Sequence, residues 1–348
     1  MNKFKKFSNI IKFKHIKKSI ILLNCVFWGG TSCAKNKEYI SHWGSTQGTF
    51  YQIVYEIPNN ENYEDKIIQL LHDFSASLST YLPTSLISRI NQNDSTAIVD
   101  DYFRTVFNKS IEVNLASGGA FDITIAPIVN SWGFGFTGNF PEMDMEKIDS
   151  LMQYVGMDKI RIEGNKLIKK LPGVMLDMNA IAKGYSVDVV ANFLKSKGCR
   201  NFLVNIGGEI VAHGVNASGD VWRTGVERPI DGAVYGEAYQ AKLHLKNRAV
   251  ATSGNNRRFF VIDGVKYGHT MNTKTGYPVR QNLLSVTIVA DDCMTADAWA
   301  TACLASGLEK SILLLQQHPE FEALFIYSDE NNNFKTHTTK GMSAIIYE

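Results

Sequence analysis

Apolar residues along this chain follow two different spacings, one typical of helices and one typical of strands. Ile67, Leu71, Phe74 and Leu78 recur every three or four residues, which predicts a helix over residues 62–78. The same spacing predicts helices over residues 86–91, 100–115 and 144–155, from the turn at Asp177 to Lys197, and over residues 294–315. Ser85 is a candidate N-cap for the short 86–91 segment.

Alternation of apolar and polar residues predicts the strands. They are expected at residues 44–55, at 159–163 and 166–169 as a hairpin, at 202–206, as short segments within 209–290, and at 322–327 and 342–347. Helical and strand segments are interleaved, without an internal repeat or a long low-complexity linker. We therefore expect a mixed α/β (α+β) fold, a single compact domain of interleaved helices and mixed sheets over residues 41–348.

The N-terminal segment has the composition of an export signal. A cationic stretch without acids precedes an apolar run from Ile20 to Trp28, and small residues follow at 29–32. This order is typical of a secretory signal peptide, here residues 1–32, and the run is too short for a permanent transmembrane helix. Its lysines are Lys3, Lys5, Lys6, Lys12, Lys14, Lys17 and Lys18.

Cys33 directly follows the small residues, as in bacterial lipoproteins that are cleaved before a cysteine and acylated on it. Gly30 stands where leucine is usual, so ordinary cleavage with an unmodified Cys33 is the alternative. Lipidation would anchor the protein to a membrane. We expect residues 33–40 to form the lipidated N-terminus and its tether, in the bacterial cell envelope and facing the periplasm.

Net charge and cysteine content exclude several classes of function. The full chain carries a formal charge of +2, which becomes −5 once the seven lysines of the signal are removed. An acidic body gives no electrostatic footprint for nucleic acid, so no nucleic-acid partner is expected. After Cys33 only Cys199, Cys293 and Cys303 remain. An odd number without paired spacing indicates buried apolar side chains rather than a disulfide framework or a zinc site.

Two helical segments contain candidate phosphate and metal chemistry. The stretch Asp177–Asp188 joins an acid, a lysine and a glycine to an amphipathic helix, a composition typical of phosphate-facing turns. Asp297 and Thr301 lie four residues apart, so they share one helix face and offer hard oxygen donors suited to Mg²⁺. Capping or a solvated face is the alternative for that pair.

Several loops add candidate groups. His269 lies in a polar segment ending at Gly276 and Pro278, where it could act as a general base or simply be a hydrogen-bonded loop histidine. Glycine-rich segments at 117–122 and 130–135 offer backbone N–H groups and aromatic rings. The GxGxxG match at 133–138 lacks a following helix start and is not read as a dinucleotide fingerprint.

The ordered set of motifs is more specific than any single one. The segments are Gln47–Tyr51, Ser79–Ser85, Ile87–Asn91, Gly118–Asp122, Pro127–Gly135, Asp177–Asp188, Asn205–Glu209, Ala251–Gly254, His269–Pro278 and Ala296–Thr301. In this order and over nearly the whole chain after Cys33, they resemble the ApbE family, the FAD:protein FMN transferases of bacterial envelopes.

This resemblance implies roles for individual residues. His269 would be the base, and Lys183 would add positive charge beside the phosphates. Mg²⁺ would be held by the Ala180 carbonyl and the side chains of Asp297 and Thr301. The residues that would contact FAD are Gln47, Tyr81, Ala120, Phe121, Asp122, Asp177, Lys183 and Met271. Asp188 is expected to be structural.

Two departures from the family pattern stand at this implied site. Gln47 replaces the usual methionine, and Asn272-Thr273 replaces the usual Asp-Pro. Loss of that carboxylate is expected to weaken the positioning of His269 or of the metal's water.

The reaction implied by the resemblance moves FMN from FAD to a Thr or Ser hydroxyl of an exported acceptor protein and releases AMP. The acceptor would be a flavinylated subunit of a membrane redox pump or a related flavoprotein. Two alternatives stay open at this point: a lipid-anchored FAD-binding protein without transfer, and a pyrophosphatase that hydrolyses FAD to FMN and AMP.

Overall fold

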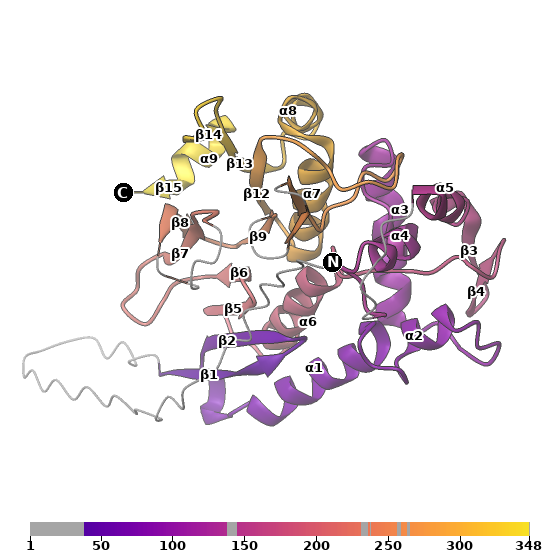
Figure 1. The fold of residues 1–348 in the computed structure, drawn as a ribbon. Coiled ribbons are helices and arrows are strands. Elements are labelled where there is room, and N and C mark those ends of the chain that lie inside the picture. Colours follow the sequence, from indigo (N-terminus) through magenta and orange to yellow (C-terminus); the bar gives the residue numbers. More distant parts are fainter. Residues whose placement is uncertain are drawn as a thin grey trace, which may run out of the picture.

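A computed structural model describes residues 38–137, 145–230, 236, 238–255, 259–262 and 265–347. Its arrangement is shown in Figure 1. The predicted signal peptide, Cys33 and most of the 33–40 tether lie outside the described residues, as does Gly138 of the GxGxxG match. Among the described residues, no helix is long and apolar enough to cross a membrane.

An eight-stranded sheet organises the described part of the chain, with strand order β1-β2-β5-β6-β9-β12-β13-β14. Its neighbouring strands pair antiparallel throughout. The strands are β1 Tyr39–Thr46, β2 Thr49–Glu56, β5 Phe202–Ile206, β6 Glu209–His213, β9 Arg248–Gly254, β12 Leu283–Ala290, β13 Glu322–Ser328 and β14 Phe334–Thr338.

Smaller sheets accompany this large one. A three-stranded sheet has the order β15-β8-β7, and two hairpins are formed by β3 with β4 and by β10 with β11. Their bounds are β7 Trp222–Glu227, β8 Tyr239–Leu245, β15 Ile346–Tyr347, β3 Ile160–Glu163, β4 Lys166–Lys169, β10 Phe259–Ile262 and β11 Val265–Gly268.

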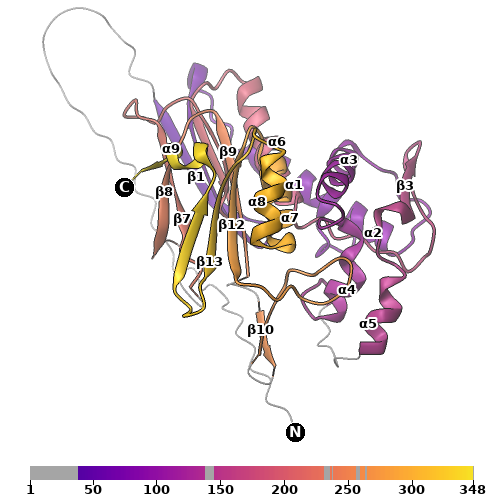
Figure 2. The ribbon, with the colours of Figure 1, turned by 90° about the horizontal axis from the view of Figure 1, so that it is seen from above.

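Helices cover one face of the large sheet, and the three-stranded sheet covers the other (Figure 2). On the helical side, strand residues such as Ile53 and Val204 join α1, α6 and α7 in the main core. On the opposite face, Leu203 and Ile210 pack with Trp222 and Leu243 in a second apolar cluster. The alternation along β5, with Val204 on one face and Leu203 on the other, produces both cores.

The helices are α1 Glu64–Leu78, α2 Leu86–Asn91, α3 Asp101–Ala116, α4 Ala126–Ser131, α5 Met145–Met152, α6 Ala182–Ser196, α7 Cys293–Ser306, α8 Leu308–Gln316 and α9 Lys340–Ile345. Short 3₁₀ turns occur at Pro58–Asn60, Ile123–Ile125 and Met157–Lys159. Ser85 caps α2 by accepting a hydrogen bond from the Ser88 N–H at 3.2 Å, as its sequence position predicted.

Three sequence predictions of secondary structure were wrong in detail. The single strand predicted at 44–55 is a hairpin, because Gln47 and Gly48 both have positive φ, 50° and 71°, and form a tight turn. The helix predicted at 294–315 is two helices, since Gly307 has φ 87° and separates α7 from α8. The 342–347 strand is mostly α9, with only Ile346–Tyr347 extended.

Cys199, Cys293 and Cys303 are buried and form no disulfide. Burial raises the pKa of the Cys199 thiol to about 11 and that of Cys303 to about 12, which keeps both protonated at neutral pH. The prediction that these residues act as small apolar side chains is confirmed.

Candidate functional site

The N-terminal ends of α6 and α7 meet at the position where the sequence places Lys183 and Asp297. Their contact is close because residue 184 is glycine: a Cβ there would lie 2.3 Å from the carbonyl oxygen of Cys293 and 2.7 Å from the Asp297 Cβ. At this crossing the Gly184 N–H donates to Oδ2 of Asp297 at 2.9 Å. The two predicted halves of the metal site are therefore in direct contact, although they are over a hundred residues apart in sequence.

An ion pair between a partly exposed lysine and a buried glutamate lies at the same junction. The Nζ of Lys183 is 2.9 Å from Oε2 of Glu209, the first residue of β6, which is buried. Burial raises the pKa of Glu209 to about 7, opposed by the positive charge of Lys183 and reinforced by the negative charge of Asp297. Burial also raises the pKa of Asp297, again opposed by Lys183. The Lys183 ammonium group thus pairs with one buried carboxyl group and lowers the pKa of a second.

This charge balance fits the binding of a cation. When both carboxyl groups are ionised, two negative charges face one ammonium group in a poorly solvated place, and a further cation would offset the excess negative charge. Within the described part of the chain, there is no cluster of three or more His, Cys, Asp or Glu side chains that could hold a metal ion. The predicted donors differ from such a cluster, since they combine the Asp297 carboxylate with a hydroxyl and a carbonyl oxygen, a donor set that suits Mg²⁺.

Thr301 lies one turn after Asp297 on α7, as the i, i+4 spacing predicted. Its Oγ1 is 2.9 Å from Oγ of Ser253 on β9, so the threonine hydroxyl is held between helix and sheet. Ala180 lies two residues before α6 and is half-buried. The three predicted metal-binding residues therefore lie on, or directly before, the two helices that meet at the junction.

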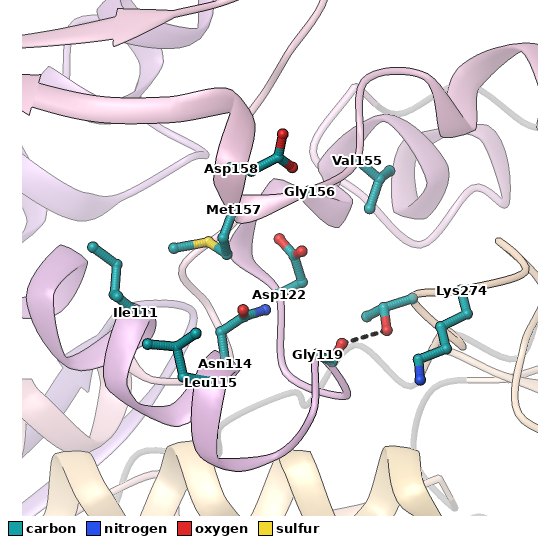
Figure 3. A pocket seen from close by; sticks show the side chains of 11 residues that line it. Ile111, Asn114, Leu115, Gly119, Asp122, Val155, Gly156, Met157, Asp158 and Lys274 are labelled. Carbon is teal, nitrogen blue, oxygen red and sulfur yellow. Dashed lines mark hydrogen bonds between the residues drawn. The ribbon is translucent and has the colours of Figure 1, made fainter.

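A cavity of about 500 Å³ lies beside the glycine-rich loop that precedes Asp122 (Figure 3). Apolar side chains of Ile111 and Leu115 line one side, and the turn at Gly156 forms another. Burial raises the pKa of Asp122, opposed by hydrogen bonds that Thr124 donates from its N–H and its hydroxyl. Asp122 is the predicted FAD-contacting side chain that lines this cavity.

Hydrogen bonds tie the cavity loop to two other predicted segments. The Thr273 hydroxyl donates to the Gly119 carbonyl at 2.5 Å, which joins the His269 loop to the glycine-rich loop (Figure 3). The Asp177 N–H donates to the Ile123 carbonyl at 2.8 Å, which joins the Asp177 turn to the same loop. Thr273 is one of the departures from the family pattern, and its hydroxyl here makes a contact that proline could not.

The turn at Asp177 also contacts the segment that holds Tyr81. Asn179 Nδ2 donates to the Thr80 hydroxyl at 3.3 Å, and the neighbouring Tyr81 ring is 56% exposed. An exposed aromatic ring beside a polar turn is available for stacking on a flat heterocycle. Gln47 is exposed at the tip of the β1–β2 turn.

The β1–β2 turn touches the turn that leads to Glu209. The Gly207 N–H donates to the Phe50 carbonyl at 2.9 Å, and a Cβ at residue 207 would lie 2.8 Å from the Thr49 side chain. Gly207 has φ 65°, a conformation that glycine adopts without strain. This close approach brings the Gln47 turn next to the strand that carries Glu209.

Buried groups anchor the His269 loop at both ends. The Trp132 Nε1–H donates to the Gly276 carbonyl at 2.8 Å, and the Thr270 hydroxyl donates to Oδ1 of Asn255 at 2.7 Å. Asn255 directly follows β9, the strand that holds Ser253 against α7. The ring of His269 lies 6.3 Å from that of Phe134, centroid to centroid.

Two residues predicted to contact FAD have buried side chains. Met271 is 5% exposed and packs with Ile128, Trp132 and Phe134 in an apolar cluster, and Phe121 is 2% exposed in the main core. Contacts with a ligand at these two positions would have to come from the backbone. Ala120, between Phe121 and the cavity glycine, is half-buried.

Sequence reasoning did not assign Glu209, Ser253 or Asp188 to the site. Glu209 and Ser253 lie inside recognised motifs, and each contacts an assigned residue, Lys183 and Thr301 respectively. An acid directly after two glycines was the available signal for Glu209. Asp188 was expected to be structural; its carboxylate accepts hydrogen bonds from two backbone N–H groups of α7.

Known proteins are similar in sequence to this chain over nearly all of the segments described above. The model of the ApbE family matches residues 47–325. The FAD:protein FMN transferase of Vibrio cholerae is 34% identical over 322 residues, covering 90% of this chain and 95% of that protein. That of Haemophilus influenzae is 35% identical over 333 residues, covering 90% and 93%.

Solved structures agree with the sequence matches. The flavin transferase ApbE from Vibrio cholerae superposes with a TM-score of 0.79 at 33% identity, covering 89% of this chain and 99% of that one. The ApbE protein from Thermotoga maritima superposes with a TM-score of 0.76 at 26% identity, covering 89% and 100%. The similarity therefore extends over the large sheet and the segments that carry the site.

Proposed function

The chain belongs to the ApbE family, and from this premise we propose that it is an FAD:protein FMN transferase that uses Mg²⁺ and a Thr or Ser hydroxyl of its acceptor. The observation that carries the metal and phosphate part is the junction at which Lys183 pairs with buried Glu209, near buried Asp297. An ammonium group that pairs with buried Glu209 and opposes the rise in the pKa of buried Asp297 suits a place where a divalent cation and phosphates bind together.

The reaction is a phosphoryl transfer. The acceptor hydroxyl oxygen forms a new bond to the phosphorus of the FMN half, and the bond from that phosphorus to the bridging pyrophosphate oxygen breaks, so that AMP leaves. His269 accepts the proton of the acceptor hydroxyl. There is little covalent chemistry for the protein itself, so catalysis depends on positioning and on stabilising charge.

The α6–α7 junction supports that charge stabilisation. Mg²⁺ held by the Ala180 carbonyl, Asp297 and Thr301 would supply Lewis-acid neutralisation of the pyrophosphate. Lys183 would add a positive charge where negative charge develops, and its contact with Glu209 holds the ammonium group at the edge of the site. Asp177 and the exposed ring of Tyr81 would orient FAD beside this junction.

Export and anchoring belong to the same proposal. Residues 1–32 would act as a lipoprotein signal and Cys33 would be acylated, which would hold the domain at a membrane of the bacterial envelope, facing the periplasm. Acceptors would then be exported flavoproteins, including subunits of membrane redox pumps.

One assay separates this function from its alternatives. The protein is incubated with FAD, Mg²⁺ and an acceptor that carries an exposed Thr or Ser, and flavin fluorescence is then read in a denaturing gel. We expect a fluorescent acceptor band and free AMP, both absent when a chelator removes Mg²⁺. Free FMN with an unlabelled acceptor would make the protein a pyrophosphatase, and intact FAD would make it a binding protein.

A further inference from the structure

We propose that Asp188 is a positioning residue of the transferase site, which with Asp297 forms a reciprocal clamp between α6 and α7 and thereby sets the metal-binding geometry. This inference rests on the proposed function. It assigns a task to a buried carboxylate that lies outside the set of predicted ligands and substrate contacts.

The first half of the clamp runs from α6 to α7. The Asp188 carboxylate accepts hydrogen bonds from the N–H groups of Cys293 at 2.9 Å and Met294 at 2.8 Å, one to each oxygen. These N–H groups begin α7 and have no partner within their own helix. Asp188 is 7% exposed, so little water can replace it. A carboxylate at a helix N-terminus also interacts favourably with the helix dipole.

The second half runs from α7 back to α6. Oδ2 of Asp297 accepts the N–H of Gly184, which lies in the first turn of α6. Ile181, the residue before α6, provides no side-chain cap, so a carboxylate of α7 caps α6 from outside. Each helix therefore satisfies first-turn N–H groups of the other.

This reciprocity determines where the predicted ligands lie. Asp297 is four residues after Cys293, one turn along α7, and Ala180 is two residues before α6 begins. A shift of the α7 N-terminus would move Asp297 relative to both Ala180 and Lys183. The absence of a side chain at Gly184 allows the helices to approach closely enough for both bonds to form.

A different carboxylate provides a matched control. Asp292 caps the same end of α7 by accepting hydrogen bonds from the N–H and hydroxyl of Thr295, but it does so from within its own segment. Its loss weakens the α7 N-terminus without removing a link to α6. Asp188→Asn replaces one of the two acceptor oxygens by an amide group, which cannot accept from a backbone N–H of α7, and so breaks a bond of the clamp. Asp292→Asn keeps one oxygen for the Thr295 N–H and leaves the clamp intact.

The test compares Mg²⁺ binding by the two variants of the full domain, by isothermal titration calorimetry in the presence of FAD, at a temperature where thermal unfolding shows both folded. We expect Asp188→Asn to weaken Mg²⁺ binding by about tenfold or more, the usual effect of losing a group that orients a metal ligand. Asp292→Asn should stay within about twofold of wild type. Asp188→Glu, which keeps the carboxylate, should recover part of the affinity.

Each outcome decides the proposal. The inference would be overturned if Asp188→Asn bound Mg²⁺ as tightly as wild type or as Asp292→Asn. Asp188 would then only stabilise the N-terminus of α7. If the wild-type protein bound no Mg²⁺, both the inference about Asp188 and the proposed metal site would be wrong. A wild-type protein that binds Mg²⁺ but transfers no FMN would refute the proposed transfer alone, since the titration still decides the clamp.

Discussion

The site is assembled from two regions that are held in place by different means. At the α6–α7 junction, Glu209 and Asp297 are each buried, and helix and strand backbones fix them. In the loop region, His269 and the glycine-rich loop depend on a few side-chain bonds, such as Thr273 to Gly119 and Trp132 to Gly276. Buried charged groups lie in the first region, and the proposed base lies in the second.

This difference has a physical reason. A buried charge is stable only with well-placed partners, so it needs the precision of regular elements. A base that must meet a hydroxyl on another protein needs access, and loops at the surface provide it. Variants in the first region should therefore change both stability and metal binding, whereas variants in the second should change transfer with little loss of stability.

The largest effect is expected for Asp297→Ala. Removing the only predicted carboxylate ligand should lower the rate of Mg²⁺-dependent transfer by at least about a thousandfold, because a metal supplies several kcal/mol of charge stabilisation. Gel fluorescence of the acceptor measures transfer, and circular dichroism checks that the fold remains. Unchanged transfer would remove Asp297 from the metal site.

His269→Ala tests the loop region. Loss of a general base is expected to slow transfer by about a hundredfold or more, while the midpoint of thermal unfolding stays within a few degrees of wild type. Initial rates at saturating FAD and Mg²⁺ measure the effect. Since the loop is anchored at Trp132 and Thr270, a large stability loss in this variant would contradict the division between the two regions.

Gly184→Ala tests how closely the helices must approach. The added methyl group would meet the Cys293 carbonyl oxygen at 2.3 Å, which rigid backbone cannot easily relieve. We expect a loss of about 3 kcal/mol in unfolding free energy, near the upper end for overpacking, together with weaker Mg²⁺ binding. Gly198→Ala, where nothing lies within 4 Å but φ is 83°, serves as a control for backbone strain without crowding. Equal losses of Mg²⁺ affinity in both would contradict the crowding argument.

The smallest effect concerns pH. The pKa of Glu209 is raised by burial from 4.5 to about 7, so the folded state binds a proton more tightly than the unfolded state. Stability due to this group is therefore fully present below pH 4.5 and is lost as the pH rises to about 7. In metal-free buffer, wild type should lose on the order of 2 kcal/mol relative to Glu209→Gln between pH 4.5 and 7.5, measured by urea unfolding. A pH-independent difference would show that Glu209 is already ionised throughout.

Local signals in the sequence were sufficient for much of the secondary structure. The helix predicted at 100–115 is α3, whose first N–H groups include that of Phe103 capped by Asp100, and the β5 strand at 202–206 was predicted with its observed bounds. Two of the three errors, at 44–55 and 294–315, arose where a turn or a glycine interrupts a continuous apolar pattern. Gly307 does not change the helical spacing around it, so the break between α7 and α8 could not be seen in that spacing.

Some features of the candidate site could likewise be predicted from the sequence, and others could not. The sequence by itself determined that Asp297 and Thr301 share a helix face and that an acid, a lysine and a glycine lie together around the start of a helix, because these are properties of short segments. Only the tertiary structure decided that Lys183 pairs with Glu209, and that Asp188 and Asp297 cap each other's helices. Those contacts join residues as many as 113 positions apart, and burial of their charges depends on how the helices pack on the sheet.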